Sequence, residues 1–263
     1  MKIDVVLPFT LFLITTVVSL LYGKYEGKIK SLLGGKELRL RDAVFLVVAM
    51  GVMVTSLMFI TKEVILAFFM FIYSLVLFTF TYLVKPKWYL AILPPAFFII
   101  LYFYFWNLYW LNFFAFVFSV FVSVYLGSLF TWKITAAFAA LLTLMDVVQV
   151  LVTGFMGTSA QKIVELGLPT VVILPTFPSE GHIILGLGDI FLSGLLVIQT
   201  TRKYGRKFGI VSTISIASGF LLFETILLNF IFRYFPATVM VIFGWLAALG
   251  IRYLYKSLVF KTD

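Results

Sequence analysis

Nine runs of mostly apolar residues, each about as long as a bilayer is thick, dominate this sequence. A helix needs about 20 such residues to cross the hydrocarbon core. Only 12% of the residues are charged and 63% are hydrophobic, which leaves too little polar surface to coat a water-soluble globule. We therefore expect an all-α polytopic membrane protein with about nine transmembrane helices. The expected spans are residues 5–23, 43–61, 64–84, 88–106, 108–130, 134–154, 182–201, 208–232 and 236–256.

The first run raises the alternative of a cleaved signal peptide. It follows Lys2, but it is long, and no small-x-small cleavage site precedes the basic segment Lys24 to Arg41. We expect it to be the first span, and the basic segment after it to be a solvated cytoplasmic loop.

The distribution of positive charges predicts how the chain is oriented in the membrane. The chain has a formal net charge of +9, and its basic residues stand in short clusters between apolar runs. This pattern is typical of cytoplasmic loops near anionic lipid, and we expect no nucleic acid as a partner. With nine spans, sixteen Lys and Arg residues fall on one side of the membrane and four on the other. The amino terminus is therefore expected outside and the carboxyl terminus in the cytoplasm.

Three of the eleven carboxylates fall inside the expected spans, at Asp146, Asp189 and Glu224. A carboxylate there costs about 3 kcal/mol on insertion scales, so each needs a reason. Asp146 lies eight residues before the outer end of its span, and Asp189 lies seven residues after the start of the next span. At about 1.5 Å per residue, both lie roughly 11 to 12 Å below the outer boundary. We expect the two aspartates at one depth on consecutive antiparallel helices.

Two carboxyls at one depth have a chemical use. If they share one proton, one can act as a general base and the other as a general acid. The base takes a proton from water as the water attacks an amide carbon, and the acid protonates the carbonyl oxygen. This aspartic-protease chemistry needs no metal or cofactor. Gly186 and Gly188, just before Asp189, would weaken the helix and let another backbone come close, although glycines in a membrane helix also serve close helix packing.

Three motifs together resemble a known family. They are LGLGDI at 185–190, the aspartate of LMDVV at 144–148, and PAT at 236–238 at the start of the last run. In order and spacing they are similar to the GxGD intramembrane aspartyl proteases, the presenilins and signal peptide peptidases, over residues 134–256. The chain differs from the family at Met145, where tyrosine is usual, and at Thr238, where leucine is usual. Its compactness suggests a prokaryotic or archaeal homologue.

The resemblance implies a presenilin-like fold of nine spans. Residues 1–133 would form an amino-terminal transmembrane bundle of five spans, and residues 134–263 a catalytic transmembrane region of four. Asp146 and Asp189 would be the catalytic pair. The residues that would shape the active site are Gly186, Leu187, Gly188, Pro236, Ala237 and Thr238.

The expected orientation matches the signal peptide peptidase branch. It implies that the partners are signal-peptide remnants or type II membrane proteins, cleaved within their transmembrane segments in the plasma membrane of a prokaryote. A substrate helix must unwind, and its freed backbone groups then need partners. The run Val171, Val172, Ile173 and Leu174 could offer a strand edge for them, or it could be a loop on the membrane surface.

Other readings stay open. An ion- or proton-coupled transporter or channel could use Asp146, Asp189 and Glu224 together. A prepilin-type peptidase shares GxGD, but it has a different helix order and lacks the terminal Pro-Ala. Glu224 is expected to be a protonated or hydrogen-bonded structural acid, with Asn229 or a backbone carbonyl as its partner. His182 is expected to be an interfacial side chain.

Overall fold

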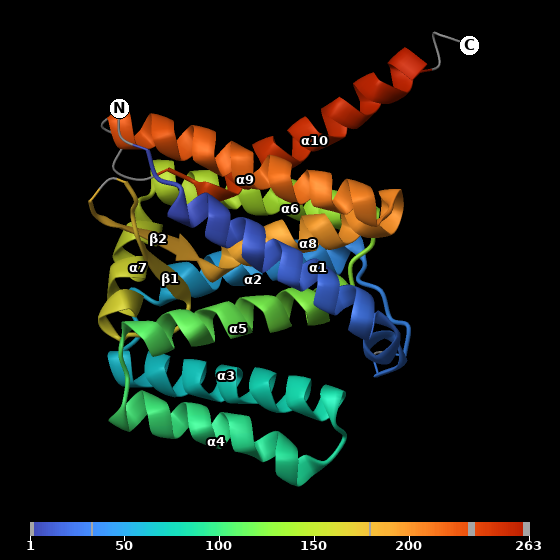
Figure 1. Ribbon diagram of the computed structural model, residues 1–263. Coiled ribbons are helices and arrows are strands. Elements are labelled where there is room, and N and C mark those ends of the chain that lie inside the picture. The colour runs from blue at the N-terminus through green and yellow to red at the C-terminus, as the bar shows by residue number, and fades with distance from the viewer. Residues whose placement is uncertain (1–2, 33, 179, 231–234, 260–263) are drawn as a thin grey trace.

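The computed structural model describes residues 3–32, 34–178, 180–230 and 235–259. The described elements are α1 (Val6–Leu32), α2 (Leu40–Ser56), α3 (Lys62–Val84), α4 (Trp88–Tyr104), α5 (Leu108–Gly127), α6 (Trp132–Val147), a π-helix (Val148–Val152), α7 (Phe155–Glu165), β1 (Val171–Pro175), β2 (His182–Gly186), α8 (Leu187–Tyr204), α9 (Arg206–Asn229) and α10 (Ala237–Val259). They form one helical bundle with a small hairpin at one end (Figure 1).

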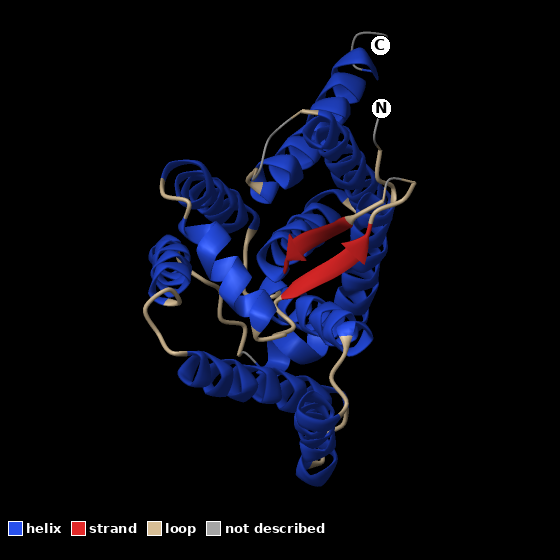
Figure 2. Cartoon of the chain, turned by 90° about the vertical axis from the view of Figure 1, so that its left-hand side faces the viewer, coloured by secondary structure: helices blue, strands red, loops and turns tan. Residues whose placement is uncertain are grey.

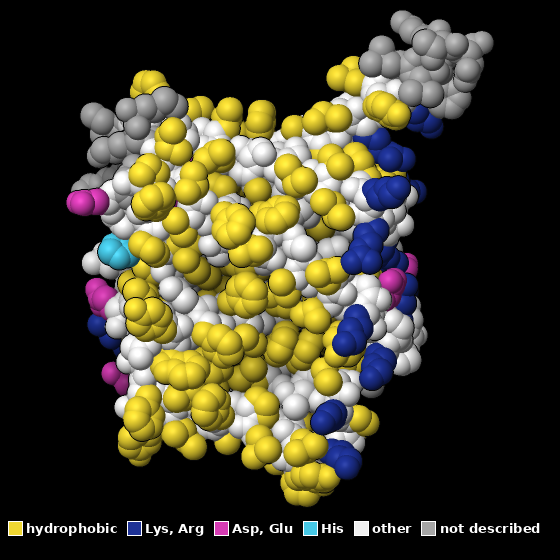
Figure 3. All heavy atoms as spheres, in the orientation of Figure 1, with side chains coloured by type: hydrophobic (Ala, Val, Ile, Leu, Met, Phe, Trp, Pro, Cys, Tyr) yellow, Lys and Arg dark blue, Asp and Glu magenta, His cyan; other side chains and the backbone are white. Residues whose placement is uncertain are grey.

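Six of the described helices are long and apolar enough to cross a membrane. They are α1, α3, α5, α6 with the π-helix, α9 and α10. Apolar side chains cover the flank of the bundle, while Lys and Arg gather along one end (Figure 3). The chain is therefore an integral membrane protein built mainly of helices.

The expected number of nine spans is not confirmed. The other three expected spans fall on α2 and α4, which have 17 residues each, and on α8, which has 18. Charged groups lie within or at the ends of two of them: Arg41 and Asp42 in α2, and Asp189, Arg202 and Lys203 in α8. Residues 231 and 232 of the expected eighth span lie outside the described residues.

Helix α8 is the centre of the bundle. Every residue from Asp189 to Thr200 is buried, because α1, α5, α6, α9 and α10 all pack around this helix. Residues 190–198 of this helix are apolar except for Ser193, and a helix that is apolar around its whole circumference is buried. Since α1 and α5 come from the first 133 residues, the two expected regions share one core.

Helix α9 packs closely against α10 through glycines. A Cβ atom added at Gly244 would lie only 2.6 Å from the Cα atom of Ile216. The hydroxyl of Ser215 donates to the Gly244 carbonyl across the same contact, at 2.6 Å. Small residues let membrane helices approach closely enough for such contacts.

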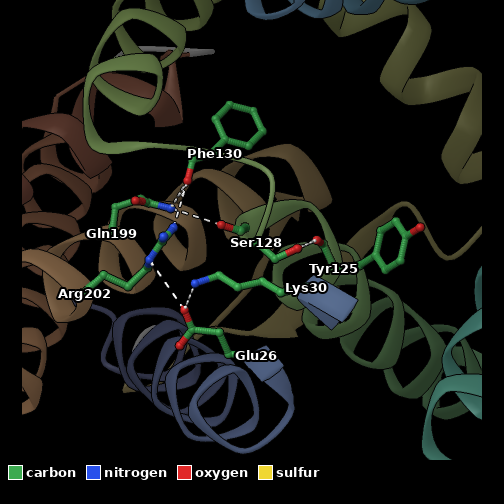
Figure 4. Close-up of polar contacts among 8 residues, drawn as sticks. Glu26, Lys30, Tyr125, Ser128, Phe130, Gln199 and Arg202 are labelled. Carbon is green, nitrogen blue, oxygen red and sulfur yellow. Dashed lines mark hydrogen bonds and ion pairs between the residues drawn. The ribbon is translucent and has the colours of Figure 1, made fainter. Parts of the chain in front are cut away.

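The basic segment after the first run is not simply a loop. Helix α1 continues to Leu32, nine residues past the expected end of the span. Glu26 pairs with Lys30 one turn later at 2.7 Å, and also lies 3.8 Å from Arg202 (Figure 4). Gln199 and Arg202 donate to the carbonyl of Phe130, which follows α5. These contacts join α1, α5 and α8 at the basic end of the bundle and explain why the helix persists there.

The β-hairpin lies at the opposite end, between the helices (Figures 1 and 2). Strands β1 and β2 are antiparallel, with Val171 opposite Gly186 and Pro175 opposite His182. The expected start of the seventh span at His182 is therefore wrong, because residues 182–186 form β2 and the helix begins at Leu187. Apolar β-branched residues fit a strand as well as a helix, and glycine at 186 and 188 disfavours the helix start upstream.

Candidate functional site

Asp146 and Asp189 line one internal cavity of about 300 Å³. Asp146 lies in the last turn of α6 and Asp189 in the first turn of α8, and their residues are only 4% and 7% exposed. The two carboxyls are close enough to interact electrostatically. Most of the remaining wall is apolar and comes from α2, α3, α6, α7 and the hairpin. The fold thus brings together the two acids that the sequence singled out.

Thr238 holds the Asp146 carboxyl. Its hydroxyl donates to Oδ2 of Asp146 at 2.6 Å, and its backbone N–H also points at this carboxyl. Thr238 is the second residue of α10, where backbone N–H groups have no partner within the helix and the helix dipole is positive. Both effects stabilise a negative charge on Asp146. Pro236 is buried just before this helix and positions its first turn.

Gly186 makes room for the Asp189 carboxyl. It is the N-cap of α8, and its N–H donates toward the carboxyl three residues later. A Cβ atom at Gly186 would lie 3.1 Å from Oδ2 of Asp189, which is tighter than ordinary contact. A Cβ atom at Gly188 would meet no heavy atom within 4 Å, and Gly188 lines the cavity. Gly186 therefore leaves space for the Asp189 carboxyl and Gly188 leaves space in the cavity, and neither glycine serves close helix packing.

Helix α7 covers the cavity at the hairpin end of the bundle. The hydroxyl of Ser159 donates to the Val54 carbonyl at 2.8 Å, and the Lys162 ammonium donates to the Leu57 carbonyl at 2.9 Å. These bonds satisfy carbonyls at the end of α2, because the last carbonyls of a helix have no N–H partner within the helix. Ser159 and Ile163 thereby reach the cavity wall.

A groove of about 730 Å³ runs along the apolar flank of the bundle between α2 and α6. Met145 and Gln149 line both this groove and the aspartate cavity. Gln149 lies in the π-helix and donates to the Gly51 carbonyl at 3.0 Å. These two side chains therefore stand between the lipid-facing groove and the acids.

The run Val171 to Leu174 is a strand, but its outer edge is occupied. The Asn112 side chain of α5 donates to the Ile173 carbonyl and accepts from the Ile173 N–H, both at 2.8 Å. The opposite edge of β1 pairs with β2. The Asn112 amide thus occupies the place of an added strand beside Ile173, and strand addition to the run Val171 to Leu174 stays a prediction.

Within the described part of the chain, the edge of the hairpin without a backbone partner is that of β2. Ile173 faces Ile184 in the ladder, and the backbone groups of Ile173 point away from β2 toward Asn112. Two residues that face each other in an antiparallel ladder either bond to each other or both direct their N–H and C=O groups away from the ladder. The backbone groups of Ile184 are thus directed away from β1, two residues from Gly186.

Glu224 lies apart from the aspartate pair. It is 6% exposed and lines a second cavity, of about 270 Å³, with its carboxyl beside that of Asp4. The expected partner Asn229 instead donates to the Thr225 carbonyl. His182 is exposed at the start of β2 and lines neither of these two cavities. Within the described residues, no group of three or more His, Cys, Asp or Glu side chains could hold a metal ion.

Sequence reasoning missed Asn112, Gln149 and Asp4. A polar amide inside an apolar run is a signal that could have pointed to the first two. Only the fold brings Asp4, which precedes the first helix, to Glu224. No known protein-family model matches this chain, and no curated protein sequence matches it significantly.

Proposed function

We propose that this protein is an intramembrane aspartic endopeptidase of the GxGD type, with Asp146 and Asp189 as its catalytic pair. The observation that carries the proposal is the pair of buried carboxyls, on α6 and α8, that face one cavity beneath the lipid-facing surface. A buried carboxyl pair without a cation is stable when it shares a proton, and this is the state that acid–base hydrolysis needs.

In this mechanism one carboxylate removes a proton from a water molecule as its oxygen attacks the substrate's carbonyl carbon. The other, protonated carboxyl donates its proton to the carbonyl oxygen, which gives a neutral gem-diol. The carboxyl that took the proton from water then donates it to the amide nitrogen, and the other carboxylate accepts a proton from the gem-diol, so the C–N bond breaks, an acid and an amine leave, and the pair regains its first protonation state. The Thr238 hydroxyl holds Asp146 in place, and the first turn of α10 stabilises its negative form.

The groove between α2 and α6 supports a lateral route for substrate. A transmembrane segment lying in the groove would reach the acids by passing Met145 and Gln149. Once it unwinds, its backbone would pair with the outward groups of Ile184 on β2, next to the catalytic cavity. Strand addition at β2 replaces the β1 edge that the sequence suggested.

The proposed topology has nine spans in a presenilin-like arrangement, with α2, α4 and α8 crossing in addition to the six longer helices. The amino terminus is outside and the carboxyl terminus is in the cytoplasm of a prokaryotic cell. The substrates are signal-peptide remnants or type II membrane proteins, whose amino termini lie inside. The Lys and Arg residues gathered at the end of the bundle opposite the hairpin support this orientation (Figure 3).

The transporter reading requires Asp146, Asp189 and Glu224 to form one site. In the fold, Asp146 and Asp189 face one cavity, while Glu224 lies with Asp4 at another. This separation favours the peptidase.

A direct test uses the purified protein in detergent, single-span peptides and mass spectrometry, with a metal chelator present throughout. We expect cuts within the apolar segment. Intact peptides across a broad panel would contradict the proposal.

A further inference from the structure

The cavity beside Glu224 has apolar walls and an acid. Its lining comes from α1, β2, α9 and α10, and includes Ile183, Leu185, Phe220 and Met240. The volume of about 270 Å³ is on the order of nine times the share of one molecule in liquid water. Such a space suits a long side chain whose stem is apolar.

Among the described residues, the Glu224 carboxyl has no donor other than the neighbouring Asp4 carboxyl. Glu224 is 6% exposed, and no N–H, hydroxyl or cationic side chain in the described part of the chain donates to either of its carboxyl oxygens. Asp4 beside it is satisfied, because the N–H groups of Val6, Leu7 and Phe177 all donate to its carboxyl. Two carboxyls in contact carry one negative charge when they share a proton, and two when a cation joins them. The Glu224 carboxyl, which lines a roomy cavity, is therefore placed to receive a cationic group.

The position of this cavity next to the catalytic cavity indicates where a cationic group would come from. Ile183, Ile184 and Leu185 of β2 line it, and Gly186, the next residue, lines the catalytic cavity. Ala237 lines the Glu224 cavity and Thr238 lines the catalytic one, so the two cavities adjoin along the same strand and the same helix start. A substrate strand added to β2 rises about 3.3 Å per residue, so it passes the Glu224 cavity about two to four residues from the acids.

We infer that the Glu224 cavity is a specificity pocket for a lysine or arginine side chain of the substrate. The basic residue stands two to four residues from the scissile bond, toward the hairpin end of the enzyme. Its methylene stem packs on Ile183, Phe220 and Met240, and its charged end pairs with Glu224 and Asp4. This inference rests on the proposed peptidase function and on strand addition at β2.

The test uses one single-span peptide, reconstituted with the enzyme in phosphatidylcholine vesicles. Lys, Arg, Gln or Glu is placed in turn at the second, third and fourth residues on the hairpin side of the scissile bond. We expect Lys or Arg to raise kcat/KM over Gln at one of these positions by at least about tenfold, as for a buried ion pair. Glu at the same position should lower it.

Two variants assign the preference to the pocket. Glu224→Gln should remove the preference for the basic peptide, so that the Lys and Gln peptides are cut at similar rates, because the charge of the pocket is lost. Glu180→Gln, an exposed acid at the same end of the molecule, is the matched control and should keep the preference. If Glu224→Gln unfolds, the wild-type panel alone still decides.

Three results would overturn the inference. They are equal rates for Lys and Gln at all three positions, a preference that survives in Glu224→Gln, and a rate that rises with Na⁺ equally for every peptide. The last would mean that the acids bind a free cation. Failure of the proposed function is distinct, because then no peptide in the panel is cut.

Discussion

The Thr238 hydroxyl offers a sharp test of how the aspartate pair is held. It donates to Oδ2 of Asp146 at 2.6 Å within a buried site. Thr238→Val keeps the shape of the side chain and removes only this donor. A hydrogen bond to a charged group contributes about 1.5 to 3 kcal/mol, so kcat should fall by roughly 10- to 150-fold. The backbone N–H of Thr238 remains, so activity should not vanish.

The chain supplies a matched control for this substitution. Thr135 in α6 is also buried, but its hydroxyl has no hydrogen-bond partner within the described residues. Thr135→Val should leave kcat unchanged, and it should raise the melting temperature or leave it as it is, because an unsatisfied buried hydroxyl is removed. The assay is peptide cleavage in detergent at saturating substrate, with melting curves for both variants. Equal kcat for Thr238→Val and wild type would refute the role given to this hydroxyl.

Three further predictions concern the shape of the site and the orientation of the chain. Gly186→Ala should lower kcat far more than Gly188→Ala, because only the first Cβ atom lies against the Asp189 carboxyl, at 3.1 Å; equal losses in a cleavage assay would contradict this. Asn112→Leu should lower the free energy of unfolding by about 1 to 3 kcal/mol for each backbone group of Ile173 that it leaves without a partner. The melting temperature should fall and cleavage should be lost. An unchanged melting temperature would speak against the Asn112 contact. For orientation, the probes are Glu180→Cys and Lys36→Cys, because both side chains are exposed, at opposite ends of the bundle, and the sequence has no other cysteine. An impermeant thiol reagent should label the first in intact cells and the second only after the cells are opened, and the reverse result would overturn both the orientation and the substrate class.

The hydropathy pattern predicted where the long helices lie because a bilayer demands long apolar segments and internal backbone hydrogen bonds. The fold brings Asp146 and Asp189 to one cavity, although the expected depth of Asp189 was counted along a helix from His182, where the chain forms a strand. The pattern failed at His182 to Gly186, where the same apolar residues pair with β1 instead of starting the helix.

Contacts that join distant segments were beyond the sequence. Asn112 meets Ile173 and Asp4 meets Glu224 only because α5 and the start of α1 pack beside the hairpin and α9. The π-helix after Asp146, which carries Gln149 toward the cavity, also depends on packing and has no sequence signal of its own. The sequence could identify the acids, but not what holds them or which edge of the hairpin is open.

The central claim is that Asp146 and Asp189 are the two halves of one acid–base pair. The most direct measurement is cleavage of a single-span peptide by wild type, Asp146→Asn, Asp189→Asn and Glu224→Gln, each purified and shown to be folded by its melting curve. We predict that both aspartate variants lose cleavage entirely, since each lacks one half of the pair, while Glu224→Gln still cuts a peptide with no basic residue at its pocket. Turnover by either aspartate variant, or complete loss in Glu224→Gln alone, would contradict this assignment.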